Sequence, residues 1–153
     1  MFDIEANALE IKDVTKVWCI VIQDIETEEV FKYGPEEIKL ALEKLNSFSR
    51  IVGHNIIFYD LCVLDKLYGY KFSGKIIDTL ILSRLSNPDR TMPWGMTGQW
   101  RPHSIEVWGH RIGKPKVSWD KWDVWDDGMM ERCVQDVLIN TEVYKALWME
   151  FKE

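Results

Sequence analysis

Extended and helical segments follow one another in an order that leaves few folds open to this chain. Segments 2–8, 15–24 and 28–33 predict strands, because β-branched and aromatic residues favour extended backbone and short polar stretches separate them. Helical periodicity then alternates with short apolar runs. This order predicts an α/β fold in which a mixed β-sheet is flanked by helices, as a single domain over residues 1–153.

Two helices with a short strand between them are expected after the three strands. Pro35 suits the first turn of a helix that ends near Phe48, because its fixed φ and missing N–H fit a helix start. Asn55 predicts the N-cap of a second helix, which Gly69 would end in a left-handed conformation. The apolar run at 51–53 predicts a buried strand between them.

Further elements are expected in the second half of the chain. Residues 75–77 predict a strand, after which Asp78 would cap a helix. Residues 86–102 lack periodicity, and a stretch of that length is uncommon unless it has a function. Helices are expected near 104–111 and from 127 onward. One stripe of the last helix is expected to face the core: Met130, Val134, Val137, Leu138, Tyr144 and Trp148.

Two carboxylates on the first strand are the chemical anomaly of the sequence. Asp3 and Glu5 are two residues apart, so both point to one sheet face, while Phe2 and Ile4 point to the other. Neighbouring carboxylates repel one another and lose hydration unless they are exposed, protonated or neutralised by a cation. Magnesium or manganese suits such oxygen ligands. The alternative is an edge strand with a solvated acidic face.

Two further acids stand in apolar surroundings. Asp60 lies early in the second expected helix, and Asp136 lies among valines in the last one. Each alone would suit a solvent-facing or capping role. Together with Asp3 and Glu5, they would supply the ligands of a two-metal site, in which paired divalent ions clamp the attacking and leaving oxygens of a phosphoryl displacement.

The charge of the chain is unevenly distributed. A formal net charge of −6 argues against a simple basic nucleic-acid binder. Residues 84–121 nevertheless carry seven basic and three acidic side chains together with four tryptophans. This composition suits a single-stranded nucleic acid, because cations follow phosphates and rings stack on bases. The alternative is a solvated loop whose tryptophans pack inward.

The cysteines and the N-terminal residues bear on location. Cys19, Cys62 and Cys133 are odd in number and lie in apolar segments, so reduced thiols in the core of an intracellular protein are expected. A thiolate zinc site is not expected without a CxxC pair. No signal peptide or membrane span is expected either, since residues 1–5 lack a basic segment and no long apolar run follows. These features predict a cytoplasmic protein without a membrane partner.

Five short motifs occur in an order that resembles a known family. In chain order they are Phe2–Leu9, Gly53–Asn55 with Asp60, Ile77–Leu80, His103–Gly109 and Cys133–Val137. Together they resemble the DEDD-type 3′–5′ proofreading exonuclease domain of family-A DNA polymerases, and most closely the phage type. The resemblance extends from Met1 to about Leu147.

The resemblance implies a ribonuclease-H-like fold and a site for two Mg²⁺ or Mn²⁺ ions. The four acids of the family match Asp3, Glu5, Asp60 and Asp136. Asp3, Glu5 and Asp136 would hold one ion, and Asp3 would bridge to a second that Asp60 reaches directly or through water. The implied reaction is the hydrolytic release of 5′-monophosphates from the 3′ end of a single strand, with DNA favoured over RNA.

The same resemblance implies substrate contacts from Asn7, Leu9, Asn55 and His103. From the residues alone, local hydrogen bonding is the better interpretation of His103 and His54. The implied partners are a single-stranded nucleic acid with a free 3′ end and a separate DNA polymerase, in the host cytoplasm if the protein is phage-encoded. The rival interpretation is a nucleic-acid-binding or polymerase-accessory module with this fold and little or no turnover.

The sequence departs from the family at Arg132. Family members of this type carry a tyrosine four residues before the last aspartate, where it orients the attacking water, and a sister branch carries a histidine five residues before it. These positions are Arg132 and Glu131 here. Arginine cannot act as a general base, because its pKa lies above about 12. One helical turn from Asp136, Arg132 would either contact the scissile phosphate or form an i,i+4 ion pair.

Overall fold

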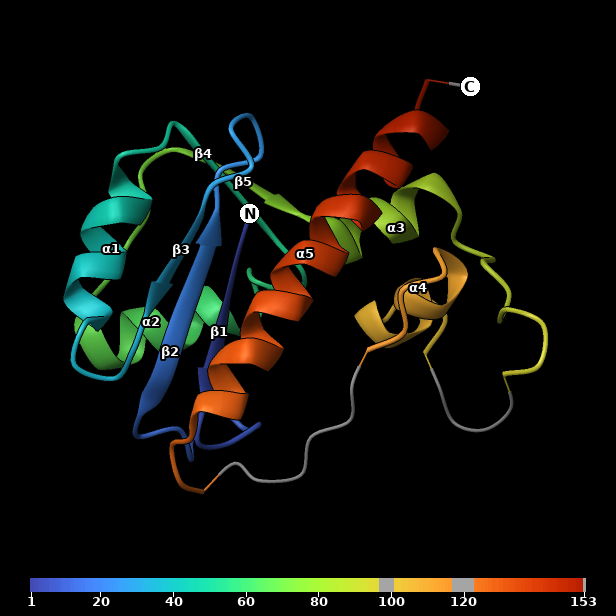
Figure 1. Ribbon diagram of the computed structural model, residues 1–153. Coiled ribbons are helices and arrows are strands. Elements are labelled where there is room, and N and C mark those ends of the chain that lie inside the picture. The colour runs from blue at the N-terminus through green and yellow to red at the C-terminus, as the bar shows by residue number, and fades with distance from the viewer. Residues whose placement is uncertain (97–100, 117–122, 153) are drawn as a thin grey trace.

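A computed structural model of the protein describes residues 1–96, 101–116 and 123–152, and it confirms an α/β fold (Figure 1). No helix among these residues is long and apolar enough to cross a membrane. The elements in chain order are β1 (Phe2–Ala6), β2 (Val17–Gln23), β3 (Val30–Tyr33), α1 (Ile38–Asn46), β4 (Arg50–Gly53), α2 (Asp60–Tyr68), β5 (Lys75–Asp78), α3 (Thr79–Ser86), α4 (Ile105–Arg111) and α5 (Asp127–Glu150).

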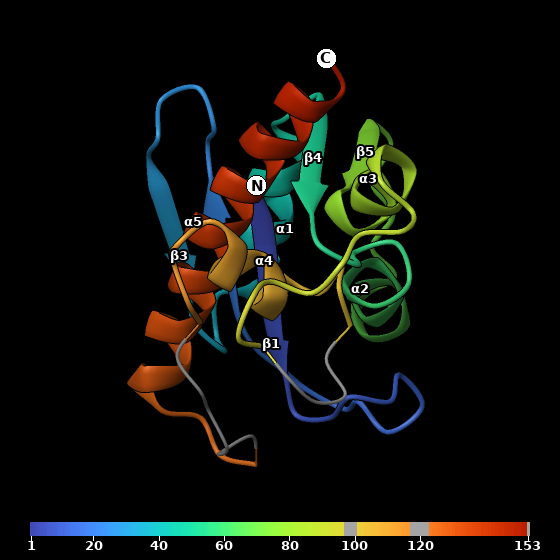
Figure 2. The same ribbon diagram turned by 90° about the vertical axis from the view of Figure 1, so that its right-hand side faces the viewer.

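The described strands form two hydrogen-bonded sheets where the sequence predicted one mixed sheet. Strands β1, β2 and β3 make the expected antiparallel meander, and β4 pairs with β5 in parallel. Strand β4 lies beside β1 (Figure 2). Gly53 allows this approach, because a Cβ there would lie 3.0 Å from the carbonyl oxygen of Phe2. The described part of the chain shows no ladder of backbone hydrogen bonds between β1 and β4.

The two faces of β1 carry different chemistry, as the alternation predicts. Phe2 and Ile4 point into a core shared with α1 and α2. Helix α5 crosses the opposite face of the three-stranded sheet (Figure 1). The register places Asp3 and Glu5 opposite residues of β2 that pack with α5. The acids of β1 therefore lie between the sheet and the C-terminal helix.

The start of α2 differs from the expectation. The helix begins at Asp60, and Asn55 does not cap it. Asn55 adopts a left-handed φ of 61°, and its N–H donates to Asp78 Oδ1 at 2.9 Å. The Asp78 carboxylate also accepts the N–H of Ile57 at 3.1 Å and, as the expected N-cap of α3, that of Leu80 at 2.9 Å. This carboxylate holds the chain after β4 in a turn, which delays the helix.

The apolar stripe of α5 also differs from the expectation. Met129, Cys133 and Val137 are buried, whereas Leu138 and Trp148 are 42% and 51% exposed. Adjacent residues of a helix point about 100° apart, so Val137 and Leu138 cannot both face the sheet. The buried face of α5 therefore passes through Cys133, one turn before Asp136.

Three smaller expectations have mixed outcomes. Gly69 ends α2 in a left-handed conformation with a φ of 62°, as predicted. Helix α1 begins three residues after Pro35 rather than at it. Cys19 and Cys133 are buried free thiols, whereas Cys62 is exposed, so its expected place in the core is wrong.

Candidate active site

Four acids that are distant in the sequence line one pocket of about 390 Å³. Asp3 and Glu5 come from β1, Asp60 is the first residue of α2, and Asp136 lies in the middle of α5. Glu5, Asp60 and Asp136 are buried, and Asp3 is half-buried. The two alternatives weighed above, a solvated acidic face and solvent-facing acids on the helices, are therefore wrong.

Burial makes the ionised state of these carboxyls costly. Burial and the nearby charge of Asp136 raise the pKa of Asp3 to about 7. Burial and the charges of Asp3 and Asp136 raise the pKa of Glu5 to about 8. Burial also raises the pKa of Asp60, with Asp3 as the next cause, and the pKa of Asp136. Each carboxylate thus disfavours the charge of its neighbours, which is the condition that a cation relieves.

The hydrogen bonding of the acids fits a cation site. Asp60 Oδ1 accepts the N–H of Ile4 at 3.3 Å. Asp136 Oδ1 is buried and has no hydrogen-bond partner among the described residues. Ligand atoms of Asp3, Glu5 and Cys133 all lie within 4.8 Å of one another. A buried oxygen without a donor is costly, and carboxylate oxygens are the ligands that Mg²⁺ and Mn²⁺ prefer. Asp3 and Glu5 therefore suit such an ion, whereas Asp60 and Asp136 line the same pocket but do not belong to this close group of the described residues.

Two basic side chains face the acids from inside the pocket. Lys116 Nζ lies 2.7 Å from Asp136 Oδ2. Arg132 Nε lies 3.6 Å from Glu5 Oε1 and 4.0 Å from Asp136 Oδ2. The side chains of Lys116 and Arg132 are only 11% and 12% exposed. The expected i,i+4 pair of Arg132 with Asp136 is thus present, but it is enclosed, and the shorter contact of Arg132 is with Glu5.

Lys116 is a pocket residue that the sequence did not reveal. It lies 20 positions before Asp136, in a segment with no helical or strand periodicity. Burial by itself lowers the pKa of Lys116, but the Asp136 carboxylate more than offsets this effect and raises the pKa above its ordinary value. Lys116 is therefore a charged ammonium group held against a ligand of the candidate metal site.

The residues expected to contact substrate fall into two groups. Leu9 and Asn55 line the pocket, and Leu9 is 87% exposed. Asn7 and His103 do not line it. The amide of Asn7 is engaged with the connection between β1 and β2. His103 Nδ1 lies 2.8 Å from Ser83 Oγ, so it is hydrogen-bonded as expected, but to a residue 20 positions away rather than locally.

Two residues within the quoted motifs line the pocket although no metal or substrate contact was expected from them. His54 Nδ1 lies 2.9 Å from Thr79 Oγ1, so this histidine is hydrogen-bonded, but to a residue 25 positions away rather than locally. Burial lowers the pKa of His54 to about 4, so the imidazole is neutral near pH 7. Glu106 of α4 lines the same pocket, and its charge contributes to the raised pKa of Asp136.

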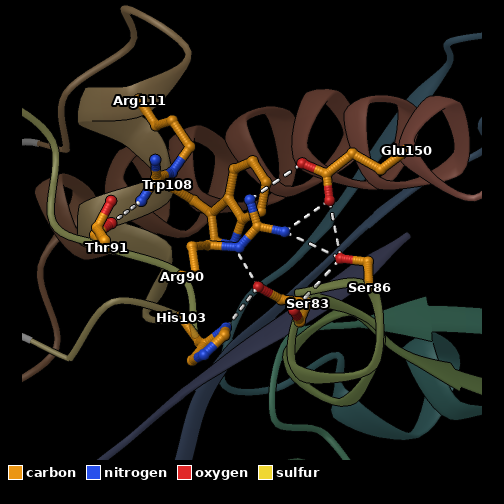
Figure 3. Close-up of polar contacts among 8 residues, drawn as sticks. All are labelled: Ser83, Ser86, Arg90, Thr91, His103, Trp108, Arg111 and Glu150. Carbon is orange, nitrogen blue, oxygen red and sulfur yellow. Dashed lines mark hydrogen bonds and ion pairs between the residues drawn. The ribbon is translucent and has the colours of Figure 1, made fainter. Parts of the chain in front are cut away.

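The helix that precedes Lys116 is anchored by a buried network (Figure 3). Trp108 of α4 is 2% exposed, and its Nε1 donates to Ser83 Oγ of α3 at 2.9 Å. The Arg90 guanidinium lies 4.4 Å from the centre of the Trp108 ring and pairs with Glu150 of α5 at 2.6 Å. These contacts fix α4 against both α3 and α5.

The basic and aromatic segment at 84–121 is therefore divided in its roles. Arg90 and Trp108 are internal, whereas Trp94 is fully exposed. Lys116 faces the acids. The predicted segment also includes Trp100, Trp119, Asp120 and Lys121, which lie outside the residues that the structure describes.

The acidic pocket differs from a second cavity of the protein in the side chains that line it. The second cavity of about 360 Å³, lined by Met1, Gln23 and Arg50 among others, contains none of the four clustered acids. Neither models of known protein families nor curated protein sequences match the chain. The chemistry of the acidic pocket is thus the observation from which a function can be argued.

Proposed function

We propose that this protein is a metal-dependent 3′–5′ exonuclease with a ribonuclease-H-like fold. It would hydrolyse phosphodiester bonds at the 3′ end of single-stranded nucleic acid, with DNA favoured over RNA, and release 5′-monophosphates. The convergence of Asp3, Glu5, Asp60 and Asp136 in one pocket carries this proposal. Clustered buried carboxylates destabilise a fold, so their presence favours a use that needs them.

The arrangement of the elements supports the proposed fold family. An antiparallel meander places β1 beside the parallel pair of β4 and β5, and α5 crosses the face that carries the acids (Figures 1 and 2). The motifs around Asp3, Asp60 and Asp136 lie far apart in the chain but meet in the pocket. Such a meeting is what the resemblance to proofreading exonucleases implies.

The acids and Arg132 would have different roles in the proposed reaction. Asp3, Glu5, Asp60 and Asp136 would hold two Mg²⁺ or Mn²⁺ ions, which acidify bound water and stabilise the charge that develops on a phosphate. Arg132 faces the acids and would offset charge on the non-bridging oxygens of that phosphate. It cannot accept a proton, so the carboxylates must orient the attacking water in place of the tyrosine of the family.

Exposed apolar groups near the pocket suit nucleic-acid bases. Leu9 lines the pocket and is 87% exposed. Phe58, two residues before Asp60, is 64% exposed. An exposed ring offers a stacking surface for a base without regard to sequence. These side chains support a single strand as the substrate, because paired bases do not present their faces.

A second function is favoured by one specific observation. Lys116 and Arg132 already pair with Asp136 and Glu5. This pairing would let the carboxylates persist without a metal ion. On that interpretation, the chain is a nucleic-acid-binding or polymerase-accessory module with little or no turnover.

Incubation with a 5′-labelled single-stranded oligonucleotide tests the proposal against this alternative. With Mg²⁺ or Mn²⁺ we expect a ladder of products shortened from the 3′ end, on DNA more than on RNA. Excess chelator should stop the reaction, because the acids alone supply no activated water. A strand with a blocked 3′ end should resist cleavage. Cleavage that survives excess chelator contradicts the proposal, and the absence of cleavage with both metals favours the accessory module.

Arg132→Ala is expected to lower kcat by about 10- to 100-fold. The estimate follows from the loss of one charge-assisted contact, about 1.5–3 kcal/mol, converted to a rate. Arg132→Tyr would restore the water-positioning group of the family and should recover part of the rate. Steady-state kinetics on a single strand measures both variants. Arg50→Ala, an exposed arginine outside the acidic pocket, is the matched control and should change little. A kcat within twofold of wild type for Arg132→Ala would remove Arg132 from the mechanism.

A further inference from the structure

The segment after α4 inserts an ammonium group among the four acids. Lys116 lines the acidic pocket, and its Nζ lies 2.7 Å from Asp136 Oδ2. The side chains of Lys116 and Asp136 are 11% and 9% exposed. Hydration is therefore largely replaced by the ion pair, which must offset the cost of burying both charges. The oxygen that Lys116 contacts belongs to a carboxylate proposed as a metal ligand.

The backbone between α4 and Lys116 fixes the position of this lysine. Gly113 adopts a φ of 72°, which favours glycine, and turns the chain back after α4. The N–H of Lys114 then donates to the carbonyl oxygen of Gly109 at 2.7 Å. A Cβ at Gly109 would lie 2.7 Å from the Lys114 carbonyl oxygen, so a larger residue would push the returning chain away. Helix α4 itself is fixed by the network around Trp108 (Figure 3).

We propose that Lys116 is an internal cation that competes with a divalent metal ion for Asp136 and, once displaced, binds a phosphate of the nucleic-acid strand. This inference deepens the proposed function and rests on it for the identity of the strand. An ammonium group at 2.7 Å and a divalent ion on the same carboxylate would repel each other strongly in a poorly hydrated pocket. Lysine has a long flexible side chain, so its Nζ can leave Asp136 while the backbone stays in place.

A purely structural ion pair and a competing cation predict opposite changes. If Lys116 only stabilises the pocket, its removal leaves Asp136 without its nearest cation, disturbs the site and weakens metal binding. If Lys116 competes, its removal strengthens metal binding. The phosphate contact adds a second signature, because each lost contact with a single strand makes the dependence of log Kd on log salt concentration shallower by about 0.7.

Mn²⁺ binding and oligonucleotide binding together test the inference. Free Mn²⁺ is measured by electron paramagnetic resonance, and Kd is measured with a single-stranded oligonucleotide whose 3′ linkage resists hydrolysis, in Mn²⁺ at several salt concentrations. We expect Lys116→Met to bind Mn²⁺ about tenfold tighter than wild type. We also expect weaker oligonucleotide binding with the shallower salt dependence. Lys114→Met removes the same charge from an exposed position of the same segment and is the matched control.

Lys116→Gln repeats the test while it keeps a hydrogen-bond donor for Asp136, in case the methionine variant does not fold. Unchanged or weaker Mn²⁺ binding by the folded variant overturns the inference, and so does an unchanged salt dependence. Both measurements are independent of turnover. A wild-type protein that binds Mn²⁺ and the strand but cleaves nothing contradicts the proposed exonuclease and leaves the role of Lys116 standing. A wild-type protein that binds no Mn²⁺ contradicts both.

Discussion

Asp3→Asn is expected to lower kcat by about 1000-fold or more while it raises the melting temperature of the metal-free protein. Asparagine keeps the shape of the side chain but removes a charge that would hold the metal ions, whose stabilisation of the transition state amounts to several kcal/mol. The same change relieves the repulsion that Asp3 shares with Glu5 and Asp136. Activity and stability should therefore move in opposite directions.

Turnover with Mg²⁺ and thermal unfolding in chelator measure the two effects separately. Asp65→Asn is the matched control, because Asp65 lies on α2 with Asp60 but is exposed, and its carboxylate lies 3.7 Å from the exposed Lys71. Removal of such an exposed ion pair should leave kcat unchanged and cost about 0.2–1 kcal/mol of stability at most. Activity of Asp3→Asn within tenfold of wild type would contradict the proposed role of Asp3 as a metal ligand.

The shared face of Asp3 and Glu5 could be predicted from the sequence because side chains alternate strictly along a strand. Phe2 and Ile4 fixed which face meets the apolar core, and the structure confirms both assignments. No such rule links β1 to Asp60 or Asp136. Those two acids were singled out by their apolar surroundings and matched to the four acids of a family by resemblance, and their convergence in the pocket depends on how α2 and α5 pack against the sheet.

The contact between Lys116 and Asp136 could not be predicted, because its causes lie in tertiary structure. It needs a turn at Gly113, a helix α4 anchored by Trp108, and the packing of α4 against α5. None of these leaves a periodic signal in the sequence. The composition of a segment reveals that charged residues are clustered there, but it does not reveal which residue each of them pairs with.

The wrong prediction for Asn55 has a similar cause. Asparagine is a good N-cap by local propensity. In the structure, the Asp78 carboxylate competes for the same stretch of backbone and binds the N–H groups of Asn55 and Ile57. A contact between residues more than 20 positions apart thus overrides a local preference and delays the start of α2 to Asp60.

The melting temperature of the metal-free protein is expected to fall by about 10 °C between pH 5 and pH 8 on account of the acidic pocket. The pKa values of Asp3 and Glu5 are raised to about 7 and about 8, from ordinary values of 3.8 and 4.5. Over this range the folded state holds protons that the unfolded chain has released, so stability is lost as the pH rises through the folded values. The loss of stability amounts to several kcal/mol, and each kcal/mol lowers the melting temperature by about 2–4 °C, which gives the expected fall.

Three other groups titrate in this range with the opposite sign. Burial lowers the pKa of His54 to about 4, that of the Met1 amino group to about 6 and that of His103 below its ordinary value, so all three favour folding as the pH rises. The contribution of the acids is therefore measured as the difference between wild type and the double variant Asp3→Asn/Glu5→Gln, in which all three groups remain. We expect the fall to be larger in wild type than in the double variant.

Magnesium should reverse this fall in wild type. An ion that binds the carboxylates stabilises the folded state in proportion to their ionisation, so the rise in melting temperature should be larger at pH 8 than at pH 5. The double variant should lose most of this response at both values. Scanning calorimetry at millimolar Mg²⁺ measures it. An equal or absent response in wild type would mean that Lys116 and Arg132 already neutralise the acids, which is the state expected of the accessory module rather than of the nuclease.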